Sequence, residues 1–173
     1  MLRSVWTVGC VGAALVMMSE DVNAQRPIEL GQDASAGIFF NGGTFFDITA
    51  PISQIRIGFQ SSENIVLEPR FSLGFTAGDG DTFTFVDAGF HVLYGLQPRS
   101  ASNSSVYVTG GVDLIFSDGP GGSNSDFSLG GGVGVRIPIL DQLAWRLEGR
   151  LDHQFDFSAT SLRGLFGLSF FTR

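Results

Sequence analysis

Residues 143–157 read LAWRLEGRLDHQFDF, and this stretch decides the fold. Every second residue from Leu143 gives Leu, Trp, Leu, Gly, Leu, His, Phe and Phe, and the residues between them give Ala, Arg, Glu, Arg, Asp, Gln and Asp. Because neighbouring side chains of a strand point to opposite faces, this period of two predicts a β-strand with one apolar and one charged face. The stretch is long enough to cross a bilayer when tilted, which takes about 9–11 residues.

Two kinds of barrel contain such a strand. A soluble barrel turns the apolar face inward and the charged face to water. A membrane barrel turns the apolar face to lipid and the polar face to the lumen. The strand fits both, so the rest of the chain has to choose between them.

The N-terminus has the pattern of a secretory signal peptide. Arg3 precedes an apolar run at residues 5–18, and Val22-Asn23-Ala24 forms a small-residue cleavage site. The run is too short for a transmembrane helix, which needs about 20 residues. We therefore expect a signal peptide at residues 1–24 and one barrel domain at residues 25–173.

The amino-acid composition excludes some classes of partner and indicates where the charged residues lie. The chain has 173 residues, 24 glycines, 17 phenylalanines and a formal net charge of −7, which argues against nucleic acid as a partner. Every basic residue is arginine, and none is lysine. A planar guanidinium binds carboxylates through two hydrogen bonds, so an arginine-only set is typical of enclosed ion pairs.

Turn signals divide the mature chain into eight strands. A phase change near Phe85 and Val86 predicts a β-bulge in the fourth strand, and residues 44–49 fit either flanking strand or a loop. The prediction is an all-β fold, an eight-stranded antiparallel up-and-down transmembrane β-barrel. The predicted strands are residues 28–40, 52–60, 65–76, 82–96, 105–117, 126–137, 143–157 and 161–172.

The charged faces collect arginines and carboxylates in nearly equal numbers. An arginine near the bilayer midplane costs about 2–4 kcal/mol on the lipid face, whereas inside a barrel it can pair. The near balance of charge favours a closed interior that neutralises itself. The expected ion-pair network of the lumen comprises Glu29, Asp33, Arg56, Glu68, Arg70, Asp87, His91, Asp113, Arg136, Arg146, Glu148, Arg150, Asp152 and Arg163.

Glycines and aromatic residues fit the same barrel. Gly130, Gly132 and Gly134 fall on the inward face, where they either make room for arginines or relieve bending strain. Aromatic residues near strand ends predict bands at the two membrane interfaces, and scattered core aromatics are the alternative. They are Phe39, Phe40, Phe45, Phe46, Phe59, Phe75, Tyr94, Phe116, Phe127, Trp145, Phe155, Phe157, Phe170 and Phe171.

With its signal peptide, eight alternating strands and final stretch LRGLFGLSFFTR at residues 162–173, the chain resembles the small outer-membrane β-barrel proteins of the outer-membrane protein A barrel family. The resemblance covers residues 26–173. It implies an outer-membrane location, periplasmic termini, outward-facing loops near residues 41–51, 77–81, 118–125 and 157–160, and assembly machinery that reads the last strand. In that family the last strand ends in an aromatic residue, whereas here Phe171 is followed by Thr172 and Arg173.

Nothing in the sequence predicts catalysis. His153 has the apolar parity of an interface residue, and His91 has the polar parity of a buried partner for Asp87. No metal-ligand spacing occurs, and the loop aspartates Asp79, Asp81, Asp118 and Asp126 form no twelve-residue calcium loop. We therefore expect no cofactor, no metal and no enzymatic activity.

Three functions follow from the fold. The first is an outer-membrane protein with a structural or loop-mediated interaction role, in contact with outer-membrane lipid and an unidentified loop partner. The second is a narrow channel or transporter for small solutes. The third is a soluble secreted barrel that binds an apolar ligand inside.

Overall fold

The computed structural model describes residues 28–41, 47–78, 81–96, 104–119, 121–156 and 158–172. The expected signal peptide, residues 1–24, lies outside them, as do residues 44–46 and Phe157. Within these ranges no helix is long and apolar enough to span a bilayer. The strands are β1 (Ile28–Asn41), β2 (Asp47–Gln60), β3 (Ile65–Gly78), β4 (Asp81–Gly95), β5 (Ser105–Gly119), β6 (Gly122–Leu140), β7 (Leu143–Gln154) and β8 (Ala159–Phe171).

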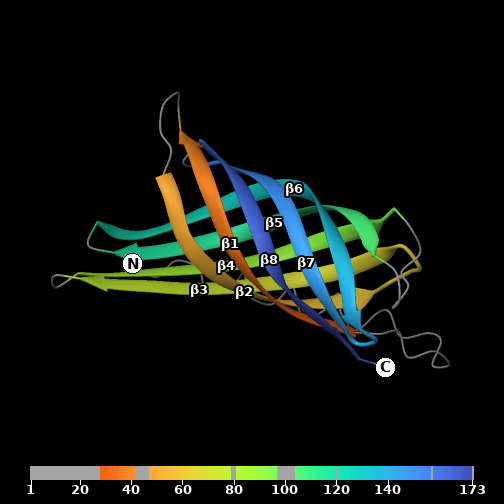
Figure 1. Cartoon of the computed structure of the whole chain (residues 1–173). Coiled ribbons are helices and arrows are strands. Elements are labelled where there is room, and N and C mark those ends of the chain that lie inside the picture. The colour runs from red at the N-terminus through yellow and green to blue at the C-terminus, as the bar shows by residue number, and fades with distance from the viewer. Residues whose placement is uncertain are drawn as a thin grey trace, which may run out of the picture.

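The eight strands form one closed antiparallel barrel in chain order (Figure 1). β1 closes the ring by pairing with β8 from Glu29↔Phe171 to Asn41↔Ala159. Beyond the last strand, Thr172 continues the closure, because its backbone N–H donates to the Ile28 carbonyl and its hydroxyl accepts from the Ile28 N–H. The predicted fold class is confirmed.

Several strands are longer than predicted at the end opposite the termini. β2 begins at Asp47, so residues 47–49 belong to that strand, and β6 begins at Gly122 rather than Asp126. The β5–β6 hairpin is tight, and Gly122 adopts a φ of +106° in it, which a residue with a side chain rarely adopts. The aspartates Asp81, Asp118 and Asp126, expected in loops, lie in strands.

The predicted bulge near Phe85 and Val86 is wrong. β4 pairs without a register shift with both β3 and β5, and its inward parity runs unbroken through Phe85, Asp87 and His91. The apolar pattern changes phase there because Phe85 is an aromatic residue on the inward parity, not because the backbone carries an extra residue. Shifts of register occur instead between Ser35 and Gly37 and between Pro138 and Leu140.

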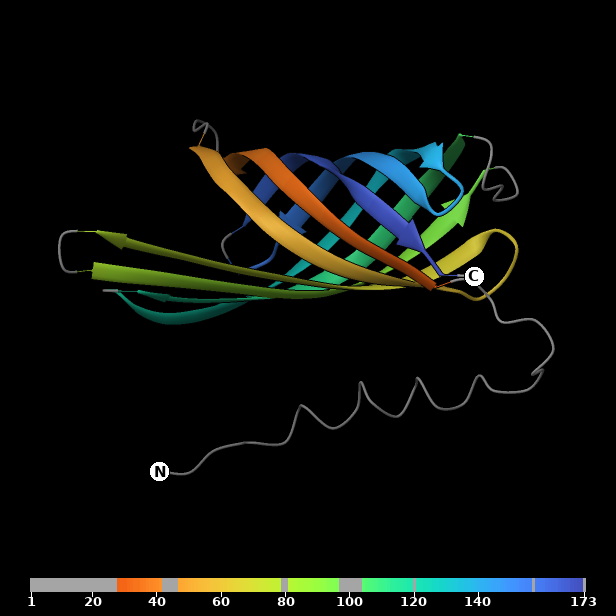
Figure 2. The ribbon, with the colours of Figure 1, turned by 60° about the horizontal axis from the view of Figure 1, so that its bottom comes forward.

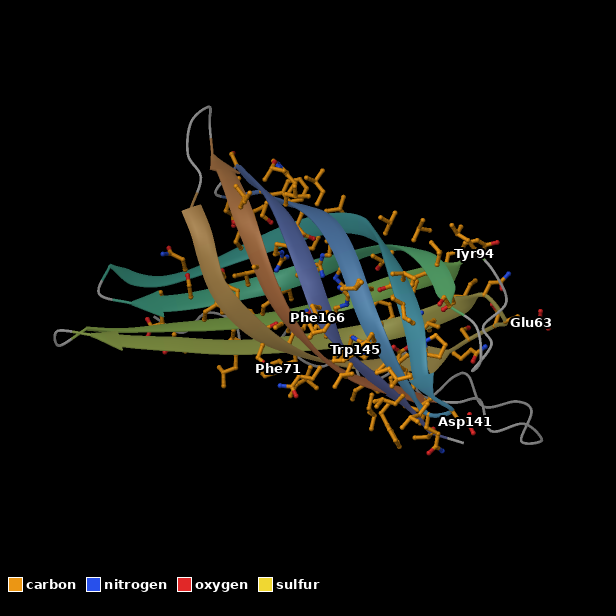
Figure 3. The ribbon with its side chains drawn as sticks, viewed as in Figure 1. Glu63, Phe71, Tyr94, Asp141, Trp145 and Phe166 are labelled. Atoms are coloured by element: carbon orange, nitrogen blue, oxygen red, sulfur yellow. The ribbon has the colours of Figure 1, made fainter. Side chains whose placement is uncertain are left out.

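The barrel is polar inside and apolar outside. Trp145 of β7, Phe71 of β3 and Phe166 of β8 point outward (Figure 3). Leu147 of β7 is exposed on the same face as Trp145. The described aromatic residues of the predicted bands that face outward with large exposure are Tyr94, Phe116, Phe127, Trp145, Phe155 and Phe170. Since Phe71, Phe90 and Phe166 also face outward between the strand ends, the aromatic residues cover the wall more broadly than two bands.

Two hairpins extend past the rest of the barrel at the end away from Ile28 and Thr172. They are β3–β4 and β5–β6, which point away together in both views (Figures 1 and 2). β4 and β5 stay paired far along this extension, to Thr84↔Asp118. The extension is therefore a four-stranded sheet that continues one side of the barrel wall.

Candidate functional site: the charged interior

The structure places the fourteen predicted network residues on the inward face. The deciding residues are those of β7, where Arg146, Glu148 and Arg150 are 0%, 4% and 1% exposed. Of the others, only Arg163 is more than slightly exposed, with 14% of its side chain accessible. Guanidinium and carboxylate groups thus face the lumen, as they would not in a soluble carrier.

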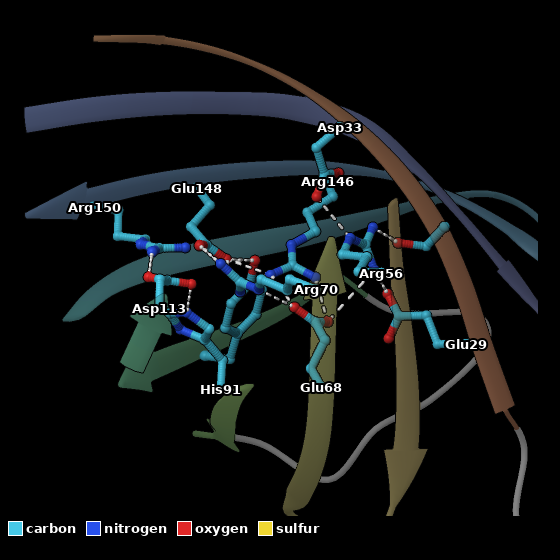
Figure 4. A network of polar contacts seen from close by, with 12 residues as sticks. Glu29, Asp33, Arg56, Glu68, Arg70, His91, Asp113, Arg146, Glu148 and Arg150 are labelled. Atoms are coloured by element: carbon cyan, nitrogen blue, oxygen red, sulfur yellow. Dashed lines mark hydrogen bonds and ion pairs between the residues drawn. The ribbon is translucent and has the colours of Figure 1, made fainter. Parts of the chain in front are cut away.

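The half of the lumen nearer Ile28 and Thr172 contains four arginines and four carboxylates, most of which are labelled in Figure 4. Arg56 of β2 joins two carboxylates of β1: its Nη1 lies 2.6 Å from Glu29 and its Nε 2.7 Å from Asp33. Arg136 approaches the same Glu29 at 2.8 Å. We call these eight residues the inner group; with four arginines and four carboxylates, the group has no net formal charge. Its members are Glu29, Asp33, Arg56, Glu68, Arg70, Arg136, Arg146 and Glu148.

Ion pairs cross the centre of this half. Arg146 of β7 donates to Glu68 of β3 at 2.6 Å and also contacts Glu148. In a second pair the arginine comes from β3 and the carboxylate from β7: Arg70 donates to Glu148 at 3.1 Å. Because β3 and β7 are four strands apart in an eight-stranded ring, they face each other across the lumen. These pairs therefore block the middle of the barrel.

Tyr107 of β5 belongs to this site although the predicted network does not include it. Its hydroxyl donates to Glu148 at 2.8 Å, and the guanidinium carbons of Arg136 and Arg146 lie 4.5 and 5.1 Å from its ring centroid. The alternation of the sequence places Tyr107 on the polar face with Thr109 and Asp113, but the predicted network collected only arginines, carboxylates and one histidine. A buried tyrosine here fills space and satisfies a carboxylate at the same time.

The outer half holds a second group built around Arg150 and Arg163. Arg150 binds Asp152 at 2.5 Å and contacts Asp113, and Arg163 binds Asp152 at 2.7 Å. Asp87 lies 4.0 Å from Arg163. This group has two guanidiniums and three carboxylates, so it carries one more negative formal charge than positive when the adjoining imidazole is neutral.

His91 does pair with a carboxylate, but the expected partner is wrong. Its Nε2 lies 2.9 Å from Asp113 of β5 rather than next to Asp87 of its own strand. Residues four apart on a strand are separated by about 13 Å, whereas diagonal neighbours on adjacent strands, such as His91 and Asp113, are about 7–8 Å apart. His153 is exposed on the outer wall, with its Nδ1 3.0 Å from the Thr160 hydroxyl.

Glycines on the inward face leave space for particular neighbours. A Cβ on Gly31 would lie 2.2 Å from the Arg56 guanidinium carbon. One prediction was that the three glycines of β6 make room for arginines. That prediction is wrong, because other groups lie against them. Gly130 faces the Asp152 carboxylate, Gly132 faces the Gly149 carbonyl, and Gly134 faces the Tyr107 ring.

We expect Gly134→Ala to lower the free energy of unfolding by about 1–3 kcal/mol, the usual cost of overpacking. The new Cβ would lie 2.2 Å from the Tyr107 ring, whose hydroxyl is held by Glu148. Urea unfolding in lipid vesicles measures the change. Gly149→Ala is the matched control, because its Cβ would meet no atom within 4 Å. Equal stabilities of the two variants would contradict the tight fit.

The interior shows no metal-binding arrangement in the described residues: no three His, Cys, Asp or Glu side chains are placed to hold an ion. A shallow groove of about 730 Å³ lies on the outer wall over β1, β6, β7 and β8, where Ala34, Ala36, Gly149 and Gly164 are small. The groove is part of the wall that faces outward, not a ligand cavity inside the barrel.

Solved structures of other proteins share the architecture of this barrel. Neisserial surface protein A is 14% identical, with a TM-score of 0.60 over 83% of this chain and 96% of that chain. Thus the chain has the fold of the small outer-membrane β-barrels. The attachment invasion locus protein Ail of Yersinia pestis matches this fold with 9% identity and a TM-score of 0.56, over 86% of this chain and 100% of Ail.

The N-terminal barrel domain of Pseudomonas aeruginosa OprF has the same small outer-membrane barrel fold. It is 12% identical, with a TM-score of 0.59 over 86% of this chain and 98% of the OprF domain. No protein-family model and no curated protein sequence matches the chain. At these identities the likeness concerns the fold alone.

Proposed function

We propose that the chain is an integral outer-membrane β-barrel with a closed interior, whose outward hairpins form an interaction surface. The observation that supports this most is the polarity of the wall. Charged side chains of β7 are buried in the lumen, while Leu147 and Leu151 between them are 42% and 55% exposed. Such a wall is stable against acyl chains and would expose a large apolar surface in water.

A channel is the weaker candidate. Ion pairs from β3 to β7 span the lumen at 2.6–3.1 Å, and Arg163 of β8 lies near Asp87 of β4 across the outer half. A solute would have to break several buried charge pairs on its way through. The role of the network is therefore to fill and stabilise the barrel, and a catalytic role has no supporting geometry.

The similar structures support a surface role. One is by name a surface protein, and another is an attachment invasion locus protein. Ail has also been solved in complex with the heparin analogue sucrose octasulfate, a polyanion. We do not extend that ligand to this chain, because the outward segments of this chain carry aspartates and no basic residue.

Export and assembly belong to the same proposal. Residues 1–24 act as a cleaved signal peptide, and the assembly machinery reads β8. On that strand Phe170, not Phe171, is the last aromatic residue that faces outward, since it is 46% exposed and shares its parity with Leu168 and Phe166.

Fractionation of a Gram-negative host tests the proposal. We expect the mature chain in the outer-membrane fraction, with faster gel migration before heating than after it, because a closed barrel resists detergent at room temperature. In planar bilayers the wild-type barrel is expected to show no discrete conductance steps. Recovery as a soluble periplasmic protein would refute the membrane assignment, and regular conductance steps would refute the closed interior.

A further inference from the structure

One strand of the projecting sheet has an unpaired edge. β3 pairs with β2 from Gln60↔Val66 to Gln54↔Ser72, and among the described residues no pairing of these strands continues beyond Ser72. Within the described residues, β3 itself continues to Gly78 paired with β4 alone, and the earlier part of β2 pairs with β1 alone. Above this point β2 and β3 diverge in both views (Figures 1 and 2).

The backbone groups that face this edge follow from the hairpin below it. The Ile65 carbonyl accepts hydrogen bonds from Ser61 and Ser62 on the β2 side, and the Asn64 carbonyl accepts from Gly95 on the β4 side. Since these directions alternate along a strand, odd-numbered residues of β3 point their N–H and C=O groups toward β2. Leu73, Phe75 and Ala77 therefore present a row of donors and acceptors that pair with no other described residue.

This edge lacks the features that usually block pairing with another strand. Residues 73–78 read LGFTAG, without a charge or a proline. The opposite edge of the projecting sheet, on β6, is partly covered: Phe155 donates to the Phe127 carbonyl, and the Asp126 carboxylate accepts from the Asp156 N–H. The β3 edge has no such cover at residues 73–78 in the described part of the chain.

Charge restricts what this edge would accept. The described residues at this end, 41, 47–53, 73–78, 81–86, 115–119, 121–128, 155–156 and 158–160, contain five aspartates and no arginine, lysine or histidine. Asp81 stands opposite Gly78 in the register, at the end of the open edge, and Asp118 on β5 is exposed. The aspartates are Asp47, Asp81, Asp118, Asp126 and Asp156.

We propose that the β3 edge, residues 73–78, binds an extended basic segment of a partner protein by strand addition. The backbone of the segment pairs with Leu73, Phe75 and Ala77, and the acidic charge of this end of the barrel favours lysine or arginine side chains in that segment. Strand addition gives affinity through main-chain hydrogen bonds, and complementary charge gives selectivity and speed of association. The inference rests on the proposed outward position of these hairpins.

A second copy of the chain is the less suitable occupant. Pairing two β3 edges would bring two sets of aspartates together with no basic residue between them, and like charges across an interface are unfavourable. We therefore expect the barrel to stay monomeric in detergent, as sedimentation would show. If the barrel instead forms a dimer, and Phe75→Pro with Ala77→Pro abolishes that dimer, then a second copy of the chain is the partner and the proposed partner is wrong.

The test uses the full-length mature barrel in nanodiscs and labelled eight-residue peptides. One peptide alternates valine with lysine, and its control alternates valine with glutamate. We expect saturable binding of the lysine peptide in an anisotropy titration, and at least tenfold weaker binding of the glutamate peptide. Equal binding of the two peptides, or no binding of either, would overturn the proposal.

Two variants separate the edge from the charge. Phe75→Pro with Ala77→Pro removes two edge-facing N–H groups and should weaken binding at least tenfold, while the same positions changed to valine should keep it. Asp81→Asn with Asp118→Asn should weaken binding several-fold at low salt. The effect should be small at 1 M salt, because the Debye length there is about 3 Å and the charges are screened from each other. Asp141→Asn, at the opposite end, is the matched control.

Heat-modifiable migration reports whether each variant is folded and inserted. A proline variant that is inserted and still binds like the valine variant would refute strand addition, while leaving the outer-membrane proposal intact. Failure of the wild-type chain to insert would refute the outer-membrane proposal itself. The two results are therefore distinguishable in one set of samples.

Discussion

Replacing Arg146 with methionine is expected to lower the free energy of unfolding by about 3–5 kcal/mol, the usual cost of removing one partner from a buried ion pair. Arg146 is fully buried and binds Glu68 from the opposite side of the lumen as well as Glu148 on its own strand. Methionine keeps much of the volume but leaves both carboxylates short of a cation. Urea titration of the barrel in lipid vesicles, with linear extrapolation, gives the change.

A double-variant cycle controls for packing. Glu68→Gln combined with Arg146→Met should cost clearly less than the sum of the single changes, because the second substitution removes a carboxylate that the first left uncompensated. Glu68 also binds Arg70 at 2.7 Å, so part of the loss should persist. A loss below about 1 kcal/mol for Arg146→Met would contradict the view that these pairs hold the barrel together.

The second large effect is expected on the opposite face of the same strand. Leu147 lies between Arg146 and Glu148 but points outward. Leu147→Arg should lower the free energy of unfolding in vesicles by about 2–4 kcal/mol, since it places a cation among acyl chains near the midplane. The same vesicle titration measures it, with Leu147→Ala as the control for lost side-chain volume.

Arginine at positions 146 and 147 thus has opposite consequences, one residue apart. In a water-soluble barrel an outward leucine at this position would meet solvent, and such surface substitutions usually change stability by less than about 0.5 kcal/mol. A change of that size for Leu147→Arg would therefore show that the outer face of β7 does not contact lipid.

The strands and their two faces were predictable from the sequence, because a period of two fixes every side chain once one face is assigned. In β7 the alternation from Leu143 gave each direction that the structure has. The strand ends were not predictable in the same way. The start of β6, at Gly122–Ser125, is polar on both faces because it projects past the apolar part of the wall, so it read as a loop.

The partners inside the lumen were not predictable from spacing. Which residues meet depends on the stagger of the strands and on the closure of the ring, which sequence distance does not contain. His91 therefore binds Asp113 rather than Asp87, and Glu68 meets Arg146 from the far side of the barrel. The unpaired edge of β3 was hidden for the same reason, since it results from where the pairing with β2 stops.

The most direct test of the inside-out polarity is quenching of Trp145 fluorescence by brominated phospholipid. Trp145 is 39% exposed on the outer wall, stacked on Phe166 at 4.8 Å, and it is the only tryptophan once residues 1–24 are removed. With Arg146 buried beside it, the account predicts strong quenching by brominated acyl chains and little quenching by aqueous iodide. Unquenched fluorescence in brominated vesicles, with efficient quenching by iodide, would contradict it.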